Sequence, residues 1–127
     1  MHLSRLDDAE PFETLDGSTI REVLHPSASP ARNQSLAEAT VPVGGETAAH
    51  YHREAEELYF FTAGRGVMRL GDVQRDVTAG DCVVIPPGTE HALVNTGEAP
   101  LVLLCCCAPA YSHEDTVLTG APALTRR

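Results

Sequence analysis

A chain of 127 residues is long enough to form one domain with a real hydrophobic core. Its net charge of −9 argues against a surface for nucleic acid or an anionic membrane, since both need clustered basic residues. Residues 1–10 lack the apolar run of a secretory signal, and the apolar stretch at 101–110 is too short to span a bilayer. We therefore expect a cytoplasmic protein that binds neither nucleic acid nor membrane.

Nine prolines and ten glycines punctuate the chain, with short apolar-alternating runs between them, a rhythm typical of all-β sandwiches and barrels. In chain order, strands are predicted at 12–15, 18–25, 34–41, 47–52, 57–63, 67–70, 73–77, 82–85, 91–95 and 101–107. Nothing has a convincing helical period, and the stretch after residue 108 is predicted to be mostly loop. The chain thus divides into N-terminal strands and a loop (1–33), a β-barrel (34–108) and a C-terminal tail (109–127).

Four residues in this pattern predict a metal site. His50 and His52 stand two apart in a predicted strand, so both side chains point to one face. Glu57 begins the next strand after a short turn, and His91 opens a later one. Three imidazole nitrogens and one carboxylate oxygen suit a divalent transition metal, and on an octahedral ion they leave positions open for a small molecule.

These residues belong to two motifs that resemble those of the cupin superfamily, in its small single-domain bacterial form. The fixed positions of the motifs, between residues 44 and 95, are occupied by the four residues above together with Gly44, Gly64, Gly80, Pro86, Gly88 and Asn95. The resemblance implies an all-β double-stranded β-helix, or jelly-roll, barrel with little helix. It also implies one divalent metal per chain (Fe, Mn, Ni, Cu or Zn), with His50, His52, Glu57 and His91 as its ligands.

Strand alternation suggests which residues surround the metal. Tyr59 and Phe61 share the face of Glu57, and Leu93 shares the face of His91. Tyr59 is a candidate for a catalytic role, although a purely structural role in the core is the alternative. On the next hairpin, Met68 is expected to line the cavity and Arg69 to lie outside.

Other features leave alternatives open. In the strand 34–41, either Gln34, Leu36 and Glu38 or the residues between them face inward. Cys105, Cys106 and Cys107 are consecutive, so at least one thiol faces the interior, where we expect a packing role. His113 lies beyond the barrel and is expected at the surface or in a subunit contact.

Because the same fold hosts many reactions, function is less determined than fold. The expected function is that of a metal-dependent enzyme, dioxygenase- or isomerase-like, acting on a small organic or aromatic substrate. The alternative is a non-catalytic cupin that binds or senses a small molecule or sugar. A homodimer is expected, with residues 12–25 adding strands to the partner's sheet.

Overall fold

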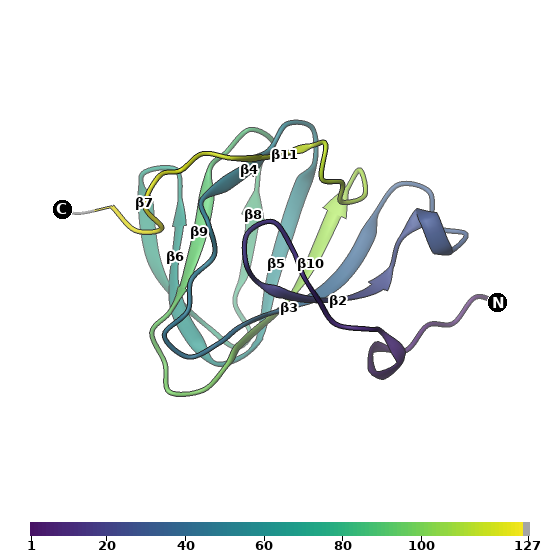
Figure 1. The fold of residues 1–127 in the computed structure, drawn as a ribbon, viewed down its shortest axis with the longest axis horizontal. Coiled ribbons are helices and arrows are strands. Elements are labelled where there is room, and N and C mark those ends of the chain that lie inside the picture. The colour runs from purple at the N-terminus through teal and green to yellow at the C-terminus, as the bar shows by residue number, and fades with distance from the viewer. Residues whose placement is uncertain (126–127) are drawn as a thin grey trace.

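The computed structural model describes residues 1–125 and consists of two antiparallel sheets packed face to face (Figure 1). The first sheet has the order β1 (Phe12–Glu13), β2 (Thr19–Leu24), β3 (Ser35–Val41), β10 (Leu101–Ala108), β5 (Glu56–Ala63) and β8 (Cys82–Ile85). The second has the order β11 (Thr116–Leu118), β4 (His50–His52), β9 (His91–Asn95), β6 (Arg65–Leu70) and β7 (Val73–Thr78). The all-β jelly-roll prediction is confirmed.

Helix is confined, within residues 1–125, to two short 3-10 turns, η1 (Leu6–Asp8) and η2 (Pro26–Ala28). No helix of the described chain has the length and apolar character that crossing a membrane would need. Each predicted strand overlaps an observed one. The strands of the N-terminal segment extend the first sheet of the same chain, because β2 pairs with β3 along most of its length.

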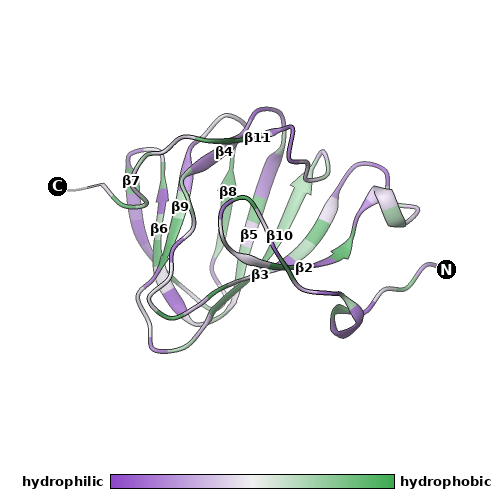
Figure 2. Ribbon diagram, viewed as in Figure 1, coloured by the Kyte–Doolittle hydropathy of each residue, from purple (hydrophilic) through white to green (hydrophobic). Residues whose placement is uncertain are grey.

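Alternation of side chains builds the core between the sheets. β10 is apolar along its length (Figure 2), and Leu101, Leu103 and Cys107 on its inner face are buried. On β5, Tyr59 and Phe61 are buried while their neighbours Leu58 and Phe60 are exposed. The inner residues of both sheets therefore form one continuous cluster, as expected for packed sheets.

Two residues of the motifs, Gly64 and Asn95, fix the connections between strands. Gly64 has a positive φ of 82°, and a Cβ there would lie 2.5 Å from the carbonyl oxygen of Pro100, so only glycine fits. The side-chain amide of Asn95 donates to the carbonyl oxygens of Val41 and Ala99 at 3.0 and 2.9 Å. These contacts fix the loop between β9 and β10 and hold β9 in register.

The C-terminal tail differs from the loop that the sequence predicted. Thr116–Leu118 forms β11, which pairs with β4 along its whole length. A three-residue strand is too short to show a periodic pattern, and its stability comes from pairing with an existing edge. Beyond β11 the chain crosses the second sheet toward β7 (Figure 1), where the Thr125 backbone N–H donates to Gln74 at 2.6 Å.

This crossing segment also explains the environment of Arg69. The side chain points to the outer face of the second sheet, as predicted, yet it is only 3% exposed. Its guanidinium donates to the carbonyl oxygens of Pro122 and Ala123 and pairs with Glu90 at 2.7 Å. The tail therefore covers an outward-facing arginine whose charge is paired and whose three guanidinium nitrogens each have a partner, with Nη1 donating to the Gly71 carbonyl oxygen.

Candidate metal centre

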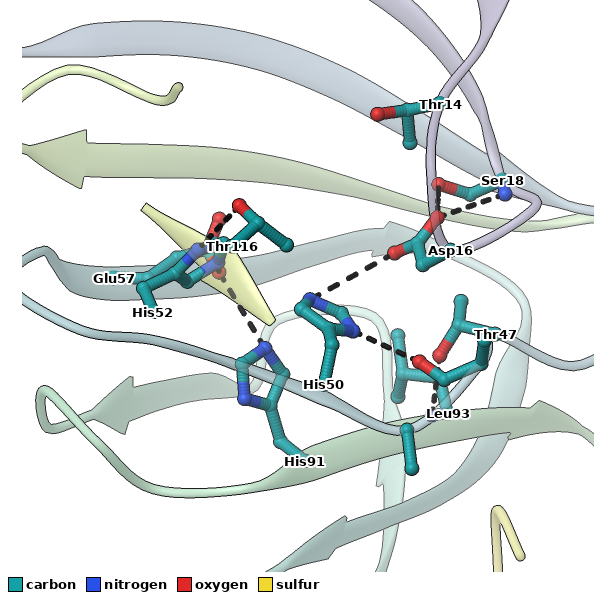
Figure 3. Close-up of polar contacts among 12 residues, drawn as sticks. Thr14, Asp16, Ser18, Thr47, His50, His52, Glu57, His91, Leu93 and Thr116 are labelled. Atoms are coloured by element: carbon teal, nitrogen blue, oxygen red, sulfur yellow. Dashed lines mark hydrogen bonds and ion pairs between the residues drawn. The ribbon is translucent and has the colours of Figure 1, made fainter. Parts of the chain in front are cut away.

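Three strands bring the four candidate ligands together. His50 and His52 lie on β4, Glu57 on β5 and His91 on β9, and His50 is the direct cross-strand partner of His91. One ligand atom from each residue lies within 4.8 Å of the others, and all four residues are buried. The four residues that the sequence predicted to lie together therefore form a single buried group (Figure 3).

Backbone carbonyls orient two of the imidazole rings. His50 Nδ1 lies 2.8 Å from the carbonyl oxygen of Ala48, and His91 Nδ1 lies 3.0 Å from that of Thr89. A carbonyl oxygen can only accept, so each Nδ1 carries the hydrogen. In the neutral ring this leaves the lone pair on Nε2, which is the nitrogen that faces the cluster.

A threonine performs the same function for His52. His52 Nδ1 lies 3.0 Å from Thr116 Oγ1, and that hydroxyl donates its own hydrogen to the carbonyl oxygen of Ser112 at 2.9 Å. Since the hydroxyl hydrogen is used there, Thr116 accepts from Nδ1–H of His52. All three histidines therefore direct Nε2 lone pairs into the same space.

Glu57 completes the group. The Cys107 thiol donates to Oε2 at 3.0 Å, while Oε1 lies 3.1 Å from His52 Nε2 and 3.6 Å from His91 Nε2. Burial alone would raise the pKa of Glu57, but the hydrogen bond to His52 and the nearby His91, when these rings are protonated, lower it to about 2. Glu57 is thus an anion, and Cys107 occupies the oxygen that faces away from the histidines.

The thiol of Cys107 has a structural role here. Burial, followed by the charge of Glu57, raises its pKa well above the ordinary value. It therefore stays protonated and acts as a hydrogen-bond donor, in keeping with the packing role expected for the cysteine run. Burial also favours the neutral form of His50. It lowers the pKa of that ring, with the neighbouring His91 as the next cause, and the neutral ring is the form that binds metal.

The chemistry of this group fits a metal ion. His91 Nε2 is fully buried and has no hydrogen-bond partner in the described chain. Buried polar atoms are rarely left unpaired, and a site for a bound ion is one recognised reason for such an atom. Three Nε2 atoms and a carboxylate oxygen converge, and a cation that replaced the hydrogen between His52 and Glu57 would satisfy all four groups.

A cavity of about 60 Å³ adjoins the cluster, with room for about four water molecules. Tyr59 and Leu93 line it, whereas Phe61 and Met68 are not among its lining residues and pack in the hydrophobic core. The inward face of β3 carries Ser35, Ala37 and Ala39, which settles the alternative left open above. Of the three consecutive cysteines, Cys105 and Cys107 line the cavity.

Several cavity residues come from segments that sequence reasoning did not connect with the site. Asp16, in the turn before β2, places Oδ2 4.0 Å from His50 Nε2 (Figure 3). Tyr111 packs its ring edge-on against His52, with centroids 5.9 Å apart, and its hydroxyl lies 3.1 Å from Thr14 Oγ1. His113 is exposed and contacts the Tyr111 ring, outside the cluster. The short N-terminal hairpin and the C-terminal tail therefore meet over the cavity.

Comparison with known proteins agrees with this architecture. Residues 37–107 match the model of the cupin domain family. The chain belongs to the cupin family. The uncharacterized protein MJ1618 of Methanocaldococcus jannaschii is 50% identical over 110 residues, which cover 87% of this chain and 88% of that protein. Protein SchB of Streptomyces halstedii is 29% identical over 86% of this chain and 78% of its own length.

Solved cupin structures show the same fold at low sequence identity. A predicted oxalate decarboxylase of Thermotoga maritima superposes with a TM-score of 0.75 at 21% identity, covering 85% of this chain and 99% of its own. The Streptomyces nucleoside dehydratase Pac13 superposes with a TM-score of 0.78 at 15% identity, covering 98% and 94%. These neighbours act on different substrates, so the shared fold leaves the reaction of this cupin open.

Proposed function

We propose that this cupin is a metal-dependent enzyme that acts on a small oxygen-bearing organic molecule, in the manner of a dioxygenase or an isomerase. The observation that carries the proposal is the convergence of three histidine Nε2 atoms and the Glu57 carboxylate beside a cavity. Bound there, a divalent Fe, Mn, Ni, Cu or Zn ion would supply Lewis-acid or redox chemistry to a molecule in the cavity.

The protein's own groups prepare the site for that role. The carbonyls of Ala48 and Thr89 and the hydroxyl of Thr116 hold the rings in one orientation, so little rearrangement accompanies binding. Tyr59 is only 5% exposed, and its ring contacts that of His91 edge-on, with centroids 5.7 Å apart. We propose that Tyr59 borders the substrate and excludes water from this side of the cavity.

The volume of the cavity limits the substrate. A cavity of about 60 Å³ favours a small compound. The apolar wall from β3 and β10, with Ala37, Ala39 and Leu103, would contact the carbon skeleton. The polar groups of the compound would face the cluster on the opposite wall.

A second candidate, a non-catalytic binding or sensing cupin, is favoured by the small size of the same cavity. A tight enclosure suits retention of a ligand as well as its conversion. The two candidates differ in one respect, since a binding module would return its ligand unchanged.

Metal content and turnover test the proposal together. Protein purified without added metal is analysed for its elements, and the metal-replete and chelator-stripped forms are screened against small hydroxy and carbonyl compounds. Product formation is followed by NMR and dioxygen uptake by an electrode. We expect near-stoichiometric metal and turnover only in the replete wild type, and loss of both in His52→Ala.

Two outcomes would contradict this proposal. Unchanged metal content in His52→Ala would show that the four-residue cluster does not hold the ion. Tight binding of a compound that metal-replete protein never converts would favour the binding module. Exposed His113, outside the cluster, offers the matched control, because His113→Ala should retain both metal and turnover.

A further inference from the structure

The charged side chains that line the cavity are all acidic. Asp16, Glu22 and Glu57 are among the lining residues of the described chain, and no arginine is. The sequence contains no lysine at all. Arg21 alternates with the inward-facing residues of β2 and pairs on the outer face with Glu38 at 3.0 Å. Within residues 1–125, a metal ion at the cluster would therefore be the cavity's sole cation.

Asp16 is held in place beside that position. Its Oδ1 accepts from the backbone N–H and the hydroxyl of Ser18, at 2.9 and 2.6 Å. Its carbonyl oxygen accepts from Ala48 N–H at 2.8 Å, and the carbonyl of the same Ala48 orients His50. The remaining oxygen, Oδ2, lies 4.0 Å from His50 Nε2, so a carboxylate oxygen is held in place beside the cluster (Figure 3).

The acidic residues of this site cancel the charge of the ion without help from a ligand. Three neutral imidazoles and the Glu57 carboxylate leave a divalent ion with one net positive charge, which the Asp16 carboxylate cancels, and Glu22 adds a further negative charge at the cavity wall. An anionic ligand would bring uncompensated negative charge into a largely buried site, and such burial is costly. A neutral ligand would add no charge, and an O–H or N–H group on it could donate to Asp16 Oδ2.

We propose that the cavity selects a small uncharged compound whose metal-binding oxygen neighbours an O–H or N–H donor, as in a 2-hydroxy amide. Asp16 sets this selectivity by accepting the donor's hydrogen bond and repelling anions. The inference rests on the proposed metal centre and adds the class of ligand that the centre accepts. It makes Asp16 a specificity-determining residue contributed by the N-terminal hairpin.

Matched probes separate charge from size. Neutral glycolamide, the monoanion glycolate and the dianion oxalate are similar in size, and calorimetry measures the affinity of each for the metal-loaded protein. In Asp16→Asn, which keeps the shape but loses the charge, the affinity ratio of oxalate to glycolamide should rise about tenfold or more, given the strength of unit-charge interactions at this range. Glycolate should shift in the same direction by less.

Controls keep the outcomes apart. Glu56→Gln removes an exposed carboxylate next to Glu57 in sequence but on the outer face of β5, and its ratio should match wild type. If Asp16→Asn fails to fold, as judged by circular dichroism, Asp16→Ser removes the same charge with a smaller side chain. Elemental analysis accompanies every titration.

Each contrary result has a distinct meaning. A metal-loaded Asp16→Asn protein whose ratio stays at the wild-type value refutes the selectivity of Asp16 alone. Metal loss confined to Asp16→Asn would make Asp16 a ligand of the ion and overturn the specificity role. Wild-type protein that holds no metal refutes the proposed function, and the inference with it.

Discussion

Thr116→Val should loosen the metal centre without touching any of its four ligands. The Thr116 hydroxyl accepts from His52 Nδ1 at 3.0 Å and donates to the Ser112 carbonyl at 2.9 Å. Valine has nearly the same shape but cannot accept, so the Nδ1–H of a ring that is only 3% exposed loses its partner. An unpaired buried donor costs about 1–3 kcal/mol.

The loss acts on metal binding more than on folding. Without an acceptor at Nδ1, the His52 ring can place its hydrogen on Nε2 and rotate, and both changes remove a lone pair from the cluster. Groups that hold metal-binding histidines in this way typically contribute about 10–100-fold in metal affinity, and we expect a loss in that range. The cost to folding should be smaller, because β11 is a short edge strand whose backbone pairing with β4 remains.

Competition with a calibrated chelator measures the affinity, and thermal unfolding of the metal-free forms measures the stability. Thr116→Ser keeps the hydroxyl and removes only a methyl group, so it should bind metal nearly as wild type does. Equal affinity of Thr116→Val and wild type would refute the assigned role of the hydroxyl. Equal losses in the serine and valine variants would assign the effect to packing of β11.

Three further predictions address protonation, thiol reactivity and assembly. Acid should destabilise the metal-free protein in two stages. Below pH 6.5 the unfolded chain takes up a proton at His50 that the folded chain does not, because burial lowers the pKa of His50 there. Below pH 4.5 the stabilisation from the Glu57 carboxylate, whose pKa is lowered to about 2, is progressively lost. Urea unfolding at successive pH values measures this, and a free energy of unfolding that stays constant on acidification would contradict it. Iodoacetamide should label exposed Cys82 and spare Cys107, because burial raises the pKa of the Cys107 thiol. Peptide mass spectrometry measures the labelling of each cysteine, and labelling of Cys107 as early as that of Cys82 would contradict the prediction. The homodimer remains a prediction, and light scattering should give twice 13.6 kDa, with a single-chain mass as the opposing result.

The grouping of the four candidate ligands could be predicted from local spacing together with the resemblance to the cupin motifs. His50 and His52 share a face through strand alternation, and Glu57 follows after one short turn. Burial of Tyr59 and Leu93 beside them follows from the same alternation. His91 is far from the other three residues in sequence, but its spacing from Pro86 and Gly88, which follow the preceding strand, matches the second cupin motif.

The groups that support these ligands could not be predicted in this way. Thr116 lies 64 positions from His52, and Cys107 lies 50 positions from Glu57, so no periodic pattern connects them. Asp16 was visible in the sequence only as half of an Asp-Gly turn, and nothing local shows that its carboxylate faces His50. Long-range pairing of β strands alone brings such residues together.

The division between these two groups follows the boundary of the family match. All four candidate ligands lie within residues 37–107, the part that matches the cupin domain model. Asp16, Tyr111 and Thr116 all lie outside it, on the hairpin before β3 and the tail after β10. The shared core would therefore hold the metal, while the flanking segments orient one ligand, enclose the cavity and set its charge. Because cupins with one core support different reactions, the residues that distinguish this protein are expected in those flanking segments. A chain trimmed to residues 37–107 should keep the four candidate ligands. It should lose the hydrogen bond that orients His52 and the selectivity that Asp16 provides.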